Sequence, residues 1–108
     1  MANDISLIVG KEYSVGFHPD EKIAQATYLG EGELEGFGKN HLFFSEESDE
    51  TYIWMSDHNI EERDGIINYS PFSSAPVGRA TRKDLRRILD REKPGRVLKF
   101  IQSLGEEI

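Results

Sequence analysis

A chain of 108 residues with no cysteine and a formal net charge of −7 predicts one small domain that folds without disulfides. This composition excludes thiol catalysis and thiolate metal sites, and no stretch approaches the ~18 apolar residues that span a bilayer. The apolar run at residues 5–9 follows no basic leader and is too short for a signal-peptide core, so we expect a cytoplasmic protein.

The charge is divided unevenly along the chain. Residues 1–76 contain 15 acidic and 4 basic side chains, a net of −11, whereas residues 77–108 contain 5 acidic and 9 basic side chains, a net of +4. Either the basic part packs against the acidic part and relieves its self-repulsion, or the two parts present two faces to two partners. We divide the single domain, 1–108, into a β-rich acidic body (1–70), a connector (71–80) and a basic helical segment (81–105).

The N-terminal part reads as strands. Residues 11–17 alternate between apolar and small polar side chains, the period-2 pattern of a half-buried strand. Residues 18–21 contain Pro19 and form a turn, and residues 23–29 are rich in β-branched and aromatic side chains. The short loop predicts that these two strands pair as a hairpin.

The next segment, residues 30–40, is rich in glycine and glutamate, and we expect an irregular loop there. Residues 41–45 and 51–56 are the strongest strand candidates, joined by the acidic connector 46–50. Apolar side chains occupy both faces of this hairpin, so each face needs a cover. The inside of a curled sheet covers one face, and another element must cover the second.

The basic segment supplies that element. Thr81 is placed to cap a helix, Pro94 and Gly95 break it, and a second helix follows. Apolar side chains recur at helical spacing, at Leu85, Ile88 and Leu89 and then at Val97, Phe100, Ile101 and Leu104. With residues 66–69 as a further strand, the expected fold is α+β. It consists of a small curled antiparallel sheet or SH3-like partial barrel of about five strands, followed by one or two C-terminal helices.

Residues 11–70 resemble the layout of SH3-like or Tudor-like small barrels. The resemblance is carried by the first hairpin, the Tyr28-Leu29-Gly30 end of its second strand, the long polar loop and the aromatic hairpin. Such barrels bind peptides, RNA or DNA, or support assemblies, so the resemblance implies binding without naming a ligand.

No catalytic motif is present. The glycine-rich segment 30–38 has neither the dinucleotide spacing nor the lysine of a phosphate-binding loop. Residues 57–65 begin like a calcium loop, but Glu62 stands where such a loop needs glycine; a transition-metal set of Asp57, His58 and Glu61 has no second histidine nearby. We therefore expect no metal, no cofactor and no enzymatic activity. The three histidines, His18, His41 and His58, match no zinc spacing and are expected at the surface or at a strand edge.

The leading interpretation is a non-enzymatic binding or regulatory protein that contacts a basic protein surface. In size and charge the chain resembles phage-encoded inhibitors and toxin-immunity proteins. The expected contact residues are acidic: Glu31, Glu33, Glu35, Glu46, Glu47, Asp49 and Glu50.

Two alternatives come from other classes. The first is a nucleic-acid-binding accessory factor whose basic helix neutralises phosphates through Arg79, Arg82, Lys83, Arg86 and Arg87. The second is a structural subunit of a larger assembly, in which another chain completes the two-faced apolar hairpin.

Overall fold

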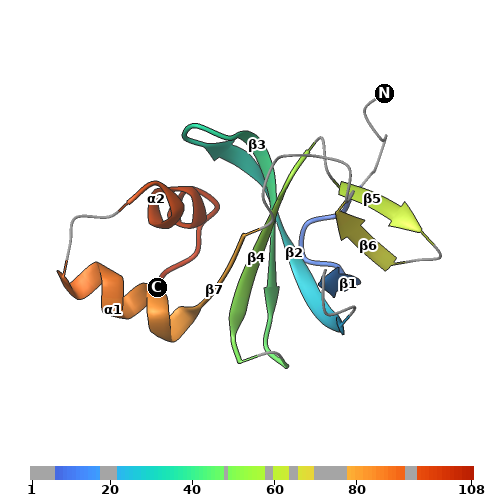
Figure 1. Ribbon diagram of the computed structural model, residues 1–108, viewed down its shortest axis with the longest axis horizontal. Helices are drawn as coiled ribbons and strands as arrows, with labels where there is room; N and C mark the ends of the chain where they lie inside the picture. The colour runs from blue at the N-terminus through green and yellow to red at the C-terminus, as the bar shows by residue number, and fades with distance from the viewer. Residues whose placement is uncertain are drawn as a thin grey trace.

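A computed structural model describes residues 7–17, 22–47, 49–57, 60–63, 66–69, 78–91 and 95–108. Its described elements confirm the α+β class: strands come first and two helices follow at the C-terminal side (Figure 1). The strands are β1 (Glu12–Phe17), β2 (Lys22–Leu34), β3 (Gly38–Ser45), β4 (Thr51–Ser56), β5 (Ile60–Arg63), β6 (Ile66–Tyr69) and β7 (Gly78–Thr81). The helices are α1 (Arg82–Arg91) and α2 (Arg96–Ser103), and neither is long and apolar enough to cross a membrane.

The strands form one sheet in the order β5-β6-β1-β2-β3-β4-β7, which leaves β5 and β7 at its edges. The expected hairpins β1–β2 and β3–β4 are present, and both are antiparallel. The expected all-antiparallel arrangement is wrong at one place, because β1 also pairs in parallel with β6, with Ser14 opposite Ile66. Two short strands were not expected: β5 lies in the segment 57–65, which begins like a calcium loop, and most of β7 lies in the predicted connector 71–80.

Strand β2 extends to Leu34 through the segment predicted as a loop, and only a tight turn separates it from β3. The pairing register shifts between Tyr28 and Gly30, so that Leu29 is the extra residue of a β-bulge. A bulge reverses which side chains face which side of the sheet. Before it, Tyr28 faces the concave side; beyond it, Glu31 does, paired with His41.

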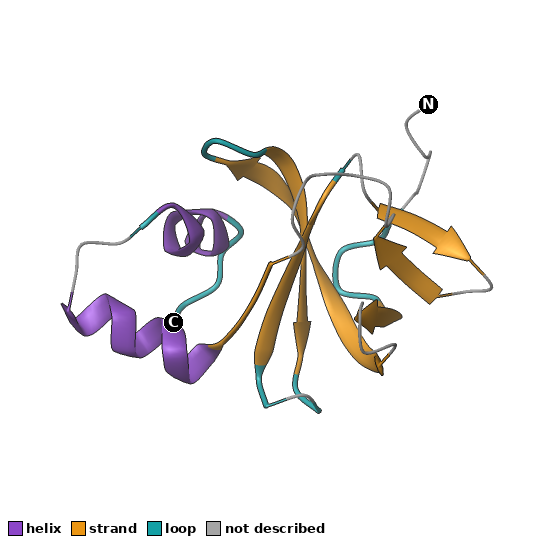
Figure 2. Ribbon diagram, in the orientation of Figure 1, coloured by secondary structure: helices purple, strands orange, loops and turns teal. Residues whose placement is uncertain are grey.

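Each face of the sheet carries its own apolar core. The concave face holds a cluster from β1 to β6: Val15, Ala24, Ala26, Tyr28, Phe43, Ile53, Met55, Ile60 and Ile67. The opposite, helix-covered face joins the sheet to both helices through Leu34, Leu42, Tyr52, Leu85, Leu98, Phe100 and Ile101. The expectation that the basic segment covers the second face of the central hairpin is confirmed, as Figure 2 shows for the helices beside β4 and β7.

Two glycines of β2 allow α2 to approach the sheet closely. A Cβ atom at Gly32 would lie 3.4 Å from the ring of Phe100, and one at Gly30 would lie 3.4 Å from Leu104. The glycines that predicted an irregular loop therefore contribute to helix–sheet packing. A strand position without a side chain leaves room for a bulky residue from the opposing layer.

Helix α1 begins as predicted, since the backbone N–H of Asp84 donates to Thr81 Oγ1 at 3.1 Å. Its expected apolar stripe is only partly correct. Leu85 is buried, whereas Ile88 is 47% exposed. The i, i+3 spacing places both on one side of the helix, but the sheet reaches only the first turn of α1, beside β7.

Gly78 on the edge strand β7 pairs with Trp54, and the indole ring occupies the space that a side chain would need. Gly78→Ala is therefore expected to lower the free energy of unfolding by about 1–3 kcal/mol, the typical cost of overpacking. Denaturant titration followed by the fluorescence of the single tryptophan measures this directly. Gly95→Ser is the control, because nothing lies within 4 Å of its Cβ position and serine is favoured at a helix N-cap. Equal stability of Gly78→Ala and wild type would contradict the ring placement.

Candidate functional site

An open hollow of about 430 Å³ lies on the half of the helix-covered face that the helices leave free. Its floor is a cross-strand row, Glu12–Thr27–Phe44, contributed by β1, β2 and β3. Gln25, Glu46 and Glu47 complete the lining. The carboxylates of Glu12, Glu46 and Glu47 are all exposed. We call these six residues the acidic groove.

Hydrogen bonds connect β2, at the groove, to the end of β3 and to the β3–β4 turn. The backbone N–H of Gln25 donates to Glu47 Oε1 at 3.0 Å, and Ser45 Oγ donates to the carbonyl of Gln25 at 2.9 Å. Phe44 is half-buried, and the Arg82 guanidinium lies 4.7 Å from its ring centre at the helix side of the groove. The floor therefore combines an aromatic surface with carboxylates from two separate parts of the chain.

The predicted acidic contact residues divide between the two ends of β3 rather than forming one surface. Glu46, Glu47, Asp49 and Glu50 belong to the β3–β4 turn, whereas Glu31, Glu33 and Glu35 lie toward the β2–β3 turn. Figure 1 places these turns at opposite ends of the sheet, roughly 25 Å apart for a strand of this length. Only Glu46 and Glu47 of the predicted set line the groove, and Glu12 joins them from β1.

The predicted basic contact residues are also not equivalent. Lys83, Arg86 and Arg87 are exposed on α1, and Arg87 lies 3.8 Å from Asp84. Arg79 is exposed on β7. Placing Arg82 on that exposed face was wrong. Its guanidinium donates to Tyr52 Oη at 2.9 Å and to Glu106 Oε2 at 3.4 Å, within the packing between α1 and the sheet.

A second polar group closes one end of the concave core. Tyr28 Oη lies 2.8 Å from His41 Nδ1, and His41 Nε2 lies 2.6 Å from Asp57 Oδ1. His41 is only 4% exposed, so the expectation of a surface or edge position was wrong for this histidine. It sits on the central strand β3, where its two ring nitrogens find the partners that a buried imidazole needs.

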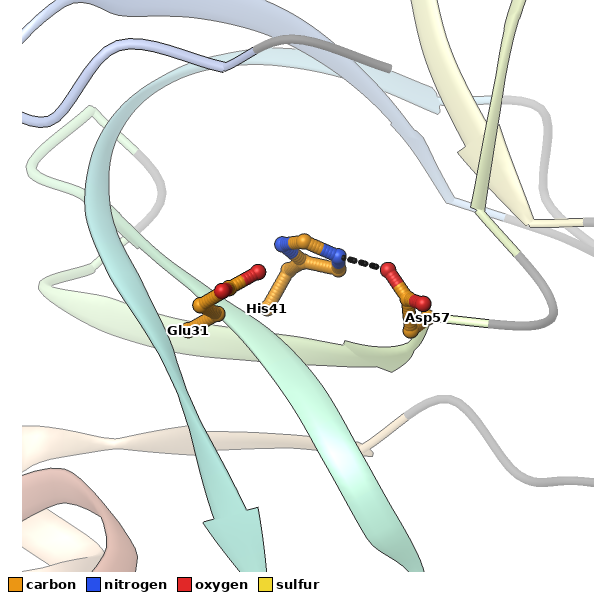
Figure 3. Close-up of side chains that lie close together, drawn as sticks. All are labelled: Glu31, His41 and Asp57. Atoms are coloured by element: carbon orange, nitrogen blue, oxygen red, sulfur yellow. Dashed lines mark hydrogen bonds and ion pairs between the residues drawn. The ribbon is translucent and has the colours of Figure 1, made fainter. Parts of the chain in front are cut away.

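Glu31 completes this group. Its carboxylate, His41 and Asp57 each offer one ligand atom within 4.8 Å of the others. Figure 3 shows the three side chains close together. Glu31 is exposed and also pairs with Lys39 at 3.2 Å between Nζ and Oε2. We call Glu31, His41 and Asp57 the polar cluster.

Burial governs the titration of the phenol beside the cluster. It raises the pKa of Tyr28 from 10.0 to about 12, and the nearby carboxylates of Glu31 and Asp57 act in the same direction. Tyr28 thus keeps its proton at neutral pH. Its hydroxyl can donate to His41 Nδ1 or accept from it, according to the tautomer of the imidazole.

Comparison with known protein families, with curated protein sequences and with solved structures found no match.

The sequence predicted Asp57 as a candidate ligand but did not predict the neighbours that the structure shows for it. Its expected partners, His58 and the side chain of Glu61, lie outside the described residues, as does His18. Its observed partners come from β2 and β3, at sequence separations that match no metal-binding motif. Only cross-strand pairing, with the bulge in β2, brings Glu31, His41 and Asp57 together.

Proposed function

We propose that the chain is a non-enzymatic protein-binding module of the cytoplasm that binds a basic protein segment in the acidic groove. The observation that carries the proposal is the convergence of Glu12, Glu46 and Glu47 around one hollow floored by Phe44. A lysine or arginine side chain fits this chemistry, because carboxylates neutralise its charge and an apolar floor suits its methylene stem. The regulatory or inhibitory role expected from size and charge belongs to the same proposal.

The surrounding charge also favours a basic partner. Asp49 and Glu50 extend the acidic region beyond the groove along the β3–β4 turn, and both are exposed. Because exposed carboxylates of one sign accelerate the approach of a positively charged surface, the turn would guide a partner toward the groove. Binding is accordingly expected to weaken as salt concentration rises.

A charge-reversal pair tests the proposal. The groove variant carries Glu12→Lys, Glu46→Lys and Glu47→Lys. The matched control carries Glu33→Lys, Glu35→Lys and Glu107→Lys, three exposed carboxylates outside the groove. Both variants change the net charge equally, so non-specific attraction weakens equally in both.

The measurement is titration of a fluorescent lysine- and arginine-rich peptide into each full-length protein. We expect at least a tenfold loss of affinity in the groove variant and no more than about a threefold loss in the control. Equal losses in the two variants would reduce the interaction to general charge attraction and would refute the groove as the site. Circular dichroism shows whether each variant remains folded.

The nucleic-acid alternative depends on fewer residues than the sequence suggested, because Arg82 is engaged with Tyr52 and Glu106. The exposed side chains Lys83, Arg86 and Arg87 still offer a small basic face. The subunit alternative rested on the apolar side chains on both faces of the β3–β4 hairpin. Those side chains are buried within the chain itself, Leu42 and Tyr52 on one face and Phe43 and Ile53 on the other.

A further inference from the structure

We propose that the polar cluster, Glu31, His41 and Asp57, binds one divalent transition-metal ion of the zinc class, at a site separate from the acidic groove. The three side chains come from β2, β3 and the end of β4, so the sheet itself fixes their relative positions. Asp57 directly follows β4, and its backbone N–H donates to the carbonyl of Lys39 on β3 at 2.9 Å, so its backbone is held against the strand that carries His41.

The separations fit a single small ion. Zinc binds histidine nitrogen at about 2.0–2.1 Å and carboxylate oxygen at about 2.0–2.2 Å, which places neighbouring ligand atoms roughly 3.3 Å apart. In the polar cluster His41 Nε2 and Asp57 Oδ1 are 2.6 Å apart, and no two of the three ligand atoms are more than 4.8 Å apart. Bonding distance to one ion requires the Glu31 and Asp57 side chains to rotate, and their exposed and half-buried positions leave room for this.

His41 is already oriented as a ligand. Tyr28 Oη contacts its Nδ1 at 2.8 Å, which leaves Nε2 directed at Asp57 and hence at the proposed ion position. A metal-bound imidazole characteristically donates its second ring N–H to an oxygen, and the phenol oxygen of Tyr28 is placed to accept it. The burial of His41 keeps this orientation fixed.

The donor set selects the class of ion. One imidazole nitrogen with two carboxylates suits Zn²⁺, Co²⁺ or Mn²⁺, whereas Ca²⁺ and Mg²⁺ prefer oxygen donors alone. A neutral imidazole and two carboxylates carry two negative charges, which a divalent ion balances when Glu31 leaves its ion pair with Lys39. Because Glu31 is exposed, solvent can reach the ion, and water would complete the coordination.

The test is Co²⁺ titration of the full chain, followed by visible absorption and calorimetry, with Zn²⁺ competition. Wild type is expected to bind one equivalent of Co²⁺ and to release it to Zn²⁺. Glu31→Gln and Asp57→Asn should each weaken Co²⁺ binding at least tenfold, while Glu33→Gln, which removes an equal charge two residues away on β2, should change it less than about twofold.

These substitutions are chosen to preserve the fold, because Glu31 is exposed and asparagine at position 57 can still accept a hydrogen bond from His41. Absence of saturable Co²⁺ binding by wild type, or equal weakening in Glu33→Gln, would overturn the proposal. Peptide binding in the acidic groove is measured without metal, so either proposal can fail while the other stands.

Discussion

Replacing Phe100 with alanine is expected to lower the free energy of unfolding by about 3–5 kcal/mol, a large part of the 5–15 kcal/mol typical of a domain. Phe100 is 2% exposed and belongs to the cluster that attaches α2 to the sheet. Its ring lies over Gly32, so no side chain of β2 at that position can move in to fill the cavity. Urea denaturation followed by circular dichroism measures the change.

Ile88→Ala is the matched control for this prediction. Both substitutions shorten a large apolar side chain on a C-terminal helix, but Ile88 is 47% exposed on α1. Its removal should cost no more than about 0.5 kcal/mol. A similar cost at both positions would mean that the helices are not seated on the sheet as described, and that burial at Phe100 contributes nothing beyond helix propensity.

The comparison of these two residues also shows what sequence periodicity can and cannot predict. The apolar hairpin required a cover on each face, and the helical spacing of Phe100 and Ile101 identified the element that supplies one. The same spacing placed Ile88 in the buried stripe. Periodicity reports which side of a helix is apolar, whereas burial also depends on how far the opposing sheet extends.

The β2 strand was mispredicted for a related reason. Glycine in isolation favours loops, but Gly30 and Gly32 lie in a strand, where Leu104 and Phe100 pack 3.4 Å from their Cβ positions. Strand propensity depends on cross-strand and cross-layer neighbours that a linear sequence does not display. For the same reason the sequence did not predict the bulge at Leu29, nor that the side chains beyond it change the face of the sheet on which they lie.

The two candidate sites differ in how far the sequence could reveal them. Glu46 and Glu47 were predicted as part of an acidic turn, so two of the three groove carboxylates were anticipated, whereas Glu12 joins them only through the pairing of β1 with β2. The polar cluster was not anticipated, because Glu31 faces His41 only after the bulge reverses the side-chain alternation. The local sequence thus predicted the acidic turn residues, whereas pairing between strands brings Glu12 to the acidic groove and Glu31 to His41.

Arg82→Ala is expected to lower the free energy of unfolding by about 2 kcal/mol. The substitution removes hydrogen bonds to Tyr52 and Glu106 and the contact of the guanidinium with the Phe44 ring, 4.7 Å from its centre. The gain from these contacts is partly offset in wild type, because Arg82 Nε is buried without a hydrogen-bond partner among the described residues. The expected effect is therefore smaller than that of Phe100→Ala.

Arg86→Ala is the control, because Arg86 is exposed on the same helix and should cost less than about 0.5 kcal/mol. Equal stabilities of the two variants would mean that Arg82 is exposed and belongs to the basic face with Lys83, Arg86 and Arg87. If instead Arg82→Ala alone is destabilised, its substitution cannot be used to test nucleic-acid binding, since lost binding would follow from lost structure. A gel shift with Lys83, Arg86 and Arg87 replaced and Arg82 retained then isolates the phosphate contacts, and unchanged retardation of the nucleic acid would exclude this face of α1.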